Sequence, residues 1–296
     1  MAGMFGFGAG LSQKIHGWRE FIVKSLQPTL WRLATATTRC QVQLVSNHPN
    51  RLALVTGTSS GIGAAAAREL LKRGWRVVGI SRRSAQIESS DYTHLHCDLS
   101  DPSRLAAGLE EEIAGFMEQP TVARLGLVNC AADPGLLGTT EQIDPARALR
   151  VFALNVVAAT WLMGVVLRHR KPDAPLRIVN VSSGVDTVPF PGLGVYGSTK
   201  AALRMAGRVL AAELDAQEQG GERLDVSVFS YQPGTVDTPM QTAVRNSPVE
   251  ALPVVGMFKK LAAEGRLAPA AGPAAEIADY LDGDGHGRFT ERRFKQ

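Results

Sequence analysis

Short apolar runs alternate with longer segments of helical periodicity along most of the chain. The apolar runs predict strands at 52–57, 75–81, 94–100, 125–132, 176–183, 224–234 and 285–290. Apolar residues at helical spacing predict helices at 64–72, 102–117, 145–167 and 195–218. Strands that alternate with helices are typical of a parallel sheet, and strands that are apolar nearly throughout indicate helices on both faces. We therefore predict a single α/β domain with a doubly wound parallel sheet over residues 51–296.

Residues 1–50 follow a different pattern. A Gly-rich start leads into a segment whose apolar residues recur at helical spacing until Pro28: Leu11, Ile15, Trp18, Ile22 and Leu26. Such a basic amphipathic helix is compatible with a membrane surface or an organelle transit signal. A floppy tail, or a stretch upstream of the true start of translation, is favoured instead because termini are commonly disordered. We expect these residues to lie outside the core.

Composition and charge narrow the class of protein. With 45% hydrophobic and 20% charged residues, the chain cannot be disordered throughout. The net charge of +4 belongs to residues 1–50, which hold five basic residues and one acidic residue, so the rest is neutral. A neutral body has no basic excess that would favour nucleic acid. We see no apolar run of the roughly 18 residues that span a bilayer, and we expect no stable membrane insertion.

The three cysteines are too few for a disulfide framework, and their spacing fits a reducing compartment. We therefore expect a cytoplasmic protein, with an organelle reached through residues 1–50 as the alternative. We expect no metal site.

A glycine-rich segment directly follows the first predicted strand and opens the first helix. It is TGTSSGIG, residues 56–63. Glycines there allow a tight turn and a close approach of the backbone to a pyrophosphate, while the helix N-terminus supplies N–H groups and a favourable dipole. Glycine also marks ordinary turns, but the position between strand and helix favours a dinucleotide site.

Residues after the second and third strands bear on the choice of cofactor. Arg82 and Arg83 follow the second strand, with no carboxylate before Glu88. In folds of this kind an acidic residue there binds the 2′-hydroxyl of NAD, whereas Arg accommodates the 2′-phosphate of NADP. This chemistry favours a role for the two arginines in binding NADP over the alternative that they form a solvated basic turn. Asp98, at the third strand end, is placed to meet the adenine or, almost equally, to cap the following helix.

Tyr196 and Lys200 stand four residues apart at the start of a predicted helix and therefore project from one face. A neighbouring ammonium favours the phenolate and lowers the pKa of a tyrosine from its usual value of about 10. The phenol then exchanges protons more readily near neutrality. The spacing is common by chance. Ser183 at the end of the preceding strand and Asn155 in the earlier long helix strengthen the catalytic interpretation.

Together these motifs resemble the short-chain dehydrogenase/reductase family over about residues 51–290. TGTSSGIG matches the cofactor loop, LNVVAAT the Asn motif, VNVSSG the catalytic Ser, YGSTK the Tyr–Lys pair and YQPGTVDTPM the nicotinamide end. The resemblance implies a Rossmann fold and a catalytic tetrad. In it, Tyr196 is the general acid in reduction and Ser183 hydrogen-bonds the carbonyl. Lys200 binds the nicotinamide ribose and tunes Tyr196, and Asn155 holds a water that links Lys200 to solvent.

The resemblance also implies a set of residues that bind NADPH or NADP. They are Gly57, Ser59, Ser60, Gly61, Ile62, Gly63, Arg82, Arg83, Asp98, Leu99, Asn129, Ala131, Tyr196, Lys200, Pro233, Gly234, Val236 and Thr238. The family's usual Asn-Asn-Ala-Gly is Asn-Cys-Ala-Ala at 129–132 here. The replacement of the last residue, Gly, by Ala132 narrows the space beside the cofactor. We interpret Cys130 as a small buried hydrophobe rather than a redox group.

From residue 181 onward the chain is similar in layout to the sepiapterin reductase and benzil reductase branch. Sepiapterin reductases carry an Asp near the chain end that holds the pterin, and the position matched to it here is Arg288. A guanidinium cannot accept hydrogen bonds from an aminopterin, so a diketone or aromatic ketone is the preferred substrate. Residues that flank the catalytic Tyr and the Pro-Gly turn are expected to line the substrate pocket: Phe190, Leu193, Val236 and Met240.

The expected function is therefore an NADPH-dependent carbonyl reductase with a helical lid near residues 237–268. The alternatives are an NADP-dependent alcohol dehydrogenase that acts oxidatively, and a nucleotide-sensing protein that has kept the fold without turnover. Family members commonly pair through their two long helices, which implies a homodimer or homotetramer.

Overall fold

The computed structural model describes residues 50–135, 137–221 and 224–295. The predicted extension therefore lies, except for its last residue, outside the described residues. Seven parallel strands form one sheet in the order β3-β2-β1-β4-β5-β6-β7. The strands are β1 (Arg51–Thr56), β2 (Arg76–Ser81), β3 (Tyr92–His96), β4 (Arg124–Asn129), β5 (Leu176–Val181), β6 (Val226–Gln232) and β7 (Phe289–Arg293). The strand order reverses between β1 and β4, which confirms the predicted doubly wound fold.

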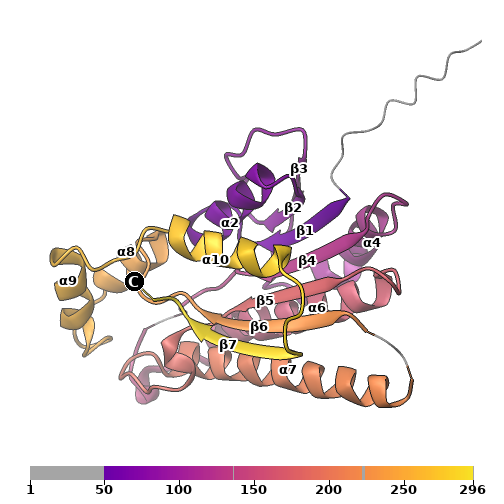
Figure 1. Cartoon of the computed structure of the whole chain (residues 1–296). Coiled ribbons are helices and arrows are strands. Elements are labelled where there is room, and N and C mark those ends of the chain that lie inside the picture. Colours follow the sequence, from indigo (N-terminus) through magenta and orange to yellow (C-terminus); the bar gives the residue numbers. More distant parts are fainter. Residues whose placement is uncertain (1–49, 136, 222–223, 296) are drawn as a thin grey trace, which may run out of the picture. The chain divides into compact units, whose positions relative to one another are not determined.

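Helices cover both faces of this sheet (Figure 1). The helices α2 (Gly61–Lys72) and α10 (Ala271–Asp282) pack on one face. The helices α4 (Glu110–Met117), α6 (Ala159–His169) and α7 (Gly194–Gln219) pack on the other. The sheet is thus the middle layer of three.

Neighbouring strand residues enter different cores because side chains alternate across a sheet. In β5, Ile178 packs in the core beneath α6 and α7, whereas Val179 packs in the core beneath α2 and α10. In β1, Leu54 and Val55 divide in the same way. Both positions are therefore apolar, which explains why these strands were recognisable as continuous apolar runs.

The long helix predicted at 145–167 consists of α5 (Pro145–Phe152), a π-helical turn η3 (Ala153–Ala158) and α6. The combined segment is long and apolar enough to cross a membrane by length and composition, so the statement that no apolar run is long enough was wrong. In the fold it is a core helix, because Leu162 and Val165 are fully buried against the sheet.

Two elements near the C-terminus differ from the prediction. Helix α10 was not predicted, since its AGPAA start contains Gly and Pro, although Ile277 and Leu281 at helical spacing are fully buried. Strand β7 begins at Phe289 rather than at Gly285 and is mostly exposed. An edge strand with charged residues lacks the continuous apolar run that marks the central strands.

The segment between β6 and α10 forms two short helices at the carboxyl edge of the sheet, α8 (Pro239–Arg245) and α9 (Val255–Ala263) (Figure 1). The Thr238 hydroxyl accepts a hydrogen bond from the Gln241 N–H (3.3 Å) and caps α8. The Ala268 N–H donates to the Thr235 carbonyl and its carbonyl accepts from the Asp237 N–H, both at 2.9 Å. These bonds tie together the two ends of the segment.

The shorter helical elements complete the chain. They are α3 (Pro102–Arg104) and η1 (Leu105–Leu109) before α4, η2 (Thr140–Gln142) before α5, and η4 (Gly184–Asp186) after β5.

Candidate active site

A cavity of about 710 Å³ opens at the carboxyl edge of the sheet. Parallel strands of doubly wound folds bind ligands at this edge. Its walls come from the loops after all seven strands and from α9. The sequence-predicted site residues line this cavity except for Asn129 and Asn155. Motifs that are far apart in the sequence, from Gly57 to Met240, thus meet at one place.

The glycine-rich loop lines one side of the cavity, and its backbone fits a dinucleotide. Gly57 has φ +77°, and a Cβ there would lie 3.0 Å from the backbone of Ala131. A Cβ on Gly63 would lie 2.4 Å from the Gly57 carbonyl, so only glycine fits between loop and helix. Helix α2 begins at Gly61, and its N-cap residue Ser60 makes no side-chain capping bond. The first N–H groups of α2 are thus positioned for a phosphate, and the residues present fit a dinucleotide.

Asp98 lies at the far end of the cavity. Its carboxylate accepts hydrogen bonds from the Ser100 N–H (3.0 Å) and hydroxyl (2.7 Å). The following helix is capped by Asp101, which accepts from the Ser103 N–H at 3.0 Å. The helix-capping alternative for Asp98 was therefore wrong.

Three arginines surround the cavity end at Asp98. Arg82 lies 4.0 Å and Arg150 lies 3.9 Å from the Asp98 carboxylate, and Arg83 lines the same wall as Arg82. Burial raises the pKa of Asp98, but the Ser100 hydrogen bonds and the two cationic charges outweigh it and lower the pKa. Arg150 was missed because nothing in the sequence of α5 relates it to the third strand.

The Tyr–Lys pair lies on the first turns of α7, as the spacing predicts. The Lys200 ammonium is 5.6 Å from the centre of the Tyr196 ring and donates to the Val181 carbonyl at 2.8 Å. Burial lowers the pKa of Lys200 to about 8, while Cys130 and Asp186 act to raise it. The ammonium therefore loses its proton at a lower pH than an ordinary lysine but is still mostly protonated at neutral pH.

Tyr196 differs from the expectation that its pKa is lowered. Burial raises the pKa of Tyr196, Cys130 adds to the rise, and a hydrogen bond with the Ser183 side chain opposes it. Burial also raises the pKa of the Cys130 thiol to about 11. Both groups are consequently protonated near neutrality, and the environment of Cys130 is that of an unreactive thiol.

Asn155 lies in the π-helical turn η3 and is buried. Its side chain accepts from the Asp133 N–H (2.9 Å) and donates to the Asp133 carbonyl (2.9 Å) and the Thr199 hydroxyl (3.0 Å). It therefore contacts the residue next to Lys200 without lining the cavity. π-Helical turns inside α-helices are frequent at functional sites.

The Asn129 side chain is buried and bonded to neighbouring elements of the fold. Its side chain donates to the Asn180 side chain at 2.9 Å and to the Ala159 carbonyl at 3.3 Å, behind the cavity wall. Asn129 does not line the cavity, and its predicted contact with a cofactor stays a prediction.

The opposite end of the cavity is mostly apolar. The predicted residues Phe190, Leu193, Val236 and Met240 line it. Helices α8 and α9 add residues that the sequence analysis did not name: Val244, Met257, Phe258 and Leu261. These were missed because only the folded path of residues 237–268 brings them over the catalytic residues.

Arg288 is far from this cavity. It directly precedes β7 at the amino edge of the sheet, where its guanidinium donates to the Leu224 (2.9 Å) and Val226 (2.5 Å) carbonyls. The placement of Arg288 in the substrate pocket was therefore wrong. Arg293, at the carboxyl end of β7, lines the cavity instead.

Comparisons with known proteins agree with this geometry. The family model "short chain dehydrogenase" matches residues 51–248. A benzil reductase ((S)-benzoin forming) from Bacillus cereus is 29% identical over 240 residues, which are 78% of this chain and 94% of that protein. A sepiapterin reductase from Meriones unguiculatus is 32% identical over 186 residues, which are 60% of this chain and 67% of that protein.

A solved structure of a short-chain dehydrogenase/reductase from Saccharomyces cerevisiae has the same fold. It superimposes with a TM-score of 0.69 at 23% identity and covers 81% of this chain and 95% of its own. The chain therefore belongs to the short-chain dehydrogenase/reductase family, near the benzil and sepiapterin reductases, and is an NAD(P)-dependent short-chain oxidoreductase.

Proposed function

We propose that the protein is an NADPH-dependent carbonyl reductase that acts on a ketone or a 1,2-diketone. The observation that carries the proposal is one shared cavity. It contains the Tyr196, Ser183 and Lys200 side chains between the glycine-rich loop and an apolar wall.

The proposed division of labour follows from the protonation states. The nicotinamide cofactor supplies the hydride that reaches the carbonyl carbon. Ser183 donates a hydrogen bond to the carbonyl oxygen, and Tyr196 gives that oxygen its proton. Burial raises the pKa of Tyr196, so the phenol holds the proton that reduction consumes. Lys200 binds the nicotinamide ribose and, as an ammonium, stabilises the resulting phenolate.

Asn155 is proposed to support the return of a proton to Tyr196. Its hydrogen bond to Thr199 places it beside the residue that directly precedes Lys200 on α7. A water held by Asn155 would connect Lys200 with solvent.

The preference for NADPH is proposed from charge. Arg82 and Arg83 follow β2, and Arg150 approaches from α5, so three guanidinium groups lie near the proposed site of the 2′-phosphate. The same wall contains Asp98, but its carboxylate already accepts two hydrogen bonds from Ser100 and lies near two of the arginines. Charge-assisted bonds to a phosphate then favour NADPH over NADH.

The apolar wall supports an aromatic or otherwise apolar carbonyl compound. Met257, Phe258 and Leu261 of α9 face the cavity together with Phe190. Benzil, the diketone in the name of the Bacillus cereus relative, has this character. Residues 237–268 are proposed to act as a lid that closes over such a substrate.

A second copy of the chain is the proposed partner. Helices α5 and α7 and the turn between α5 and α6 expose large apolar side chains: Leu149, Val157, Met205 and Val209 are 48–72% exposed. Pairing through these helices to a homodimer or homotetramer would cover them. The proposed location is the cytoplasm, where the free thiols Cys97 and Cys130 would stay reduced.

A turnover assay tests the proposal. Purified protein is given NADPH with a panel of aromatic ketones and 1,2-diketones, and the loss of NADPH absorbance is followed together with the alcohol product. We expect stoichiometric oxidation of NADPH with at least one diketone. Binding of NADPH without turnover on any member of the panel would favour a nucleotide-sensing protein, and turnover only from alcohol and NADP would favour the oxidative direction.

A further inference from the structure

Asp186 is a buried carboxylate three residues after Ser183, at the end of the short helix η4. It is 9% exposed. One of its oxygens accepts from the Ser182 hydroxyl at 2.7 Å and the other from the Gln232 side-chain amide at 3.0 Å. Both oxygens therefore act as acceptors, which is the pattern of an ionised carboxylate. A buried negative charge is costly unless a positive charge lies nearby.

The nearby positive charges come from α7. Asp186 acts to raise the pKa of Lys200 and also that of Arg204. Arg204, however, forms a bidentate ion pair with Glu291 of β7, with one contact at 2.8 Å. Its charge is thus already balanced. Lys200 donates to the Val181 carbonyl at 2.8 Å, and Asp186 accepts from the hydroxyl of the next residue, Ser182, at 2.7 Å, so adjacent residues at the end of β5 hold the two charged groups.

Two further titratable groups of the described chain lie close to Lys200, and neither carries a negative charge near neutrality. Cys130 at the end of β4 has its pKa raised to about 11, and burial also raises the pKa of Tyr196 on α7. Among the described groups that act on the Lys200 ammonium, Asp186 is the carboxylate, and both of its oxygens accept hydrogen bonds. Lys200 itself is 2% exposed, so water compensates its charge poorly.

We propose that Asp186 is a positioning residue that supplies the buried negative charge needed to keep Lys200 protonated. The hydrogen bonds from Ser182 and Gln232 anchor this charge to the ends of β5 and β6, behind the catalytic side chains. The Asp186 N–H also donates to the Ser183 carbonyl at 3.0 Å, which fixes the carboxylate to the turn that carries the catalytic serine. Asp186 thereby sets the upper pH limit of the carbonyl reduction. This consequence for catalysis rests on the function proposed above.

The sign of the effect follows from charge. Removing the negative charge favours the neutral amine, so the pKa of Lys200 falls below its value of about 8. The basic limb of the pH profile for reduction should then move to lower pH by about one unit. A merely structural role would lower activity equally at every pH and leave the limb in place.

The direct test is a titration of Lys200 by NMR in the full chain without substrate, using lysine labelled with ¹³C at Cε. Lys200→Arg assigns the signal. Asp186→Asn keeps the size of the side chain and should lower the Lys200 pKa by about one unit. The matched control is Asp215→Asn on the same helix, which removes a carboxylate that pairs with Arg288 at 3.1 Å at the amino edge. It should leave the Lys200 pKa unchanged.

The pH dependence of kcat/KM for Asp186→Asn completes the test, with Ser182→Ala as the variant that removes one hydrogen bond and keeps the charge. We expect a displaced basic limb for Asp186→Asn and a much smaller displacement for Ser182→Ala. An unchanged Lys200 pKa in folded Asp186→Asn would overturn the proposal. The NMR result does not depend on turnover, so it separates a failure of this inference from a failure of the proposed function.

Discussion

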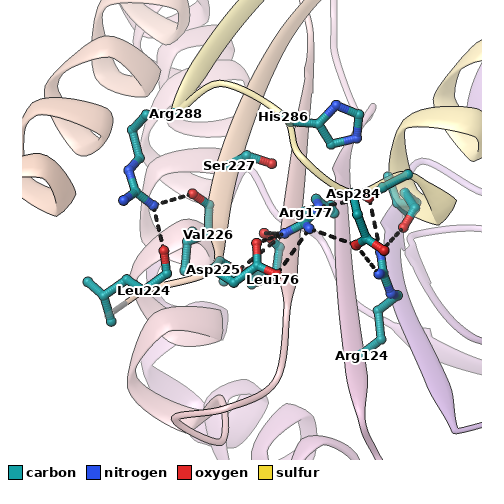
Figure 2. A network of polar contacts seen from close by, with 12 residues as sticks. Arg124, Leu176, Arg177, Leu224, Asp225, Val226, Ser227, Asp284, His286 and Arg288 are labelled. Carbon is teal, nitrogen blue, oxygen red and sulfur yellow. Dashed lines mark hydrogen bonds and ion pairs between the residues drawn. The ribbon is translucent and has the colours of Figure 1, made fainter. Parts of the chain in front are cut away.

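Two cations are buried at opposite edges of the same sheet, and their surroundings differ. Arg177, near the amino end of β5, is 1% exposed, and Lys200, at the carboxyl edge, is 2% exposed. The Arg177 guanidinium forms a bidentate pair with Asp225 (2.7 and 3.2 Å) and also contacts Asp284 at 3.1 Å (Figure 2). Lys200 donates to a backbone carbonyl, and within the described chain no carboxylate lies within ion-pair distance of it.

The difference explains what each edge can do. Burying a charge costs free energy unless partners replace its hydration, and Arg177 has replaced it with two carboxylates and the Gly283 carbonyl. Its charge is therefore fixed. Lys200 is compensated only in part, by a dipole and a more distant carboxylate, so its pKa falls to about 8. Incomplete compensation makes Lys200 a group that can lose and regain a proton near neutral pH.

Two further arginines give the amino edge the same character. Arg124 donates to the Leu281 and Gly283 carbonyls at 3.0 and 3.2 Å and pairs with Asp284 (Figure 2). Arg288 donates to the Leu224 carbonyl, just before β6, and to the Val226 carbonyl, which begins β6 (Figure 2). Each guanidinium donates to carbonyl groups at the amino edge of the sheet, those of Arg124 at the end of α10 and those of Arg288 at the start of β6. This edge is closed by hydrogen bonds, whereas the other edge contains the cavity.

Replacing Tyr196, the proposed proton donor of the carboxyl edge, should have the largest effect. Tyr196→Phe keeps the ring and its packing but removes the proton, so only the chemical step should suffer. We expect turnover to fall by about 10²–10⁴-fold while NADPH still binds. Stopped-flow turnover and fluorescence titration of NADPH measure the two quantities. Near-normal turnover would show that the proton comes from another group, and the tetrad assignment would fail.

Removing the fixed cation of the amino edge should affect stability instead. Arg177→Met fills a similar volume but leaves the Asp225 and Gly283 carbonyls without their donor. We expect a loss of about 1–3 kcal/mol in the free energy of unfolding, measured in urea, with unchanged kcat/KM per folded molecule. Arg168→Met is the matched control, because Arg168 is half exposed where it pairs with Glu110 and should cost less than about 1 kcal/mol. Equal losses in the two variants would refute the contrast.

The sequence predicted the parts of this comparison that depend on local spacing. The glycine-rich loop and the Tyr–Lys pair are each contained in one strand-to-helix turn or one helix turn, so the spacing alone determines their geometry. The structural role of Arg177 was not predicted, because its strand was recognised by its apolar pattern alone. Its partners Asp225 and Asp284 lie about 50 and 107 residues away in the sequence. Asp186 was missed for a similar reason, since its partner Gln232 is the last residue of a different strand, β6. Packing between distant segments leaves no local periodicity.

An effect of similar size, on cofactor choice rather than on stability, is expected at the cofactor end of the carboxyl edge. Replacing both Arg82 and Arg83 by Ala removes charge-assisted bonds that are typically worth about 1.5–3 kcal/mol. The preference for NADPH over NADH should shrink by roughly tenfold or more in calorimetric titrations. Arg150→Ala sharpens the test, because Arg150 reaches the same wall from α5 and should shrink the preference by less. Equal affinities for NADPH and NADH in the unmutated protein would contradict the assignment.

The smallest effect is expected on the free energy of unfolding, from a titratable group at the amino edge. His169 ends α6, and its ring contacts Glu118 (2.9 Å) and Glu110 (3.0 Å). The Glu118 hydrogen bond raises the pKa of His169, burial opposes the rise and Glu110 adds to it. A folded-state pKa above the unfolded value stabilises the fold below about pH 6.5, and this contribution disappears as the pH rises through the folded-state pKa.

The variant His169→Gln should therefore lower the free energy of unfolding by less than about 1 kcal/mol at pH 6 and leave it unchanged at pH 9. Urea unfolding of both proteins at the two pH values measures the difference. Because His169 does not line the cavity, the pH profile of kcat/KM should be unchanged in this variant. A stability difference that does not change with pH would mean that the ring acts by packing rather than by charge. A displaced activity profile would mean that protons at the two edges are coupled, and the division between a fixed and a reactive edge would have to be abandoned.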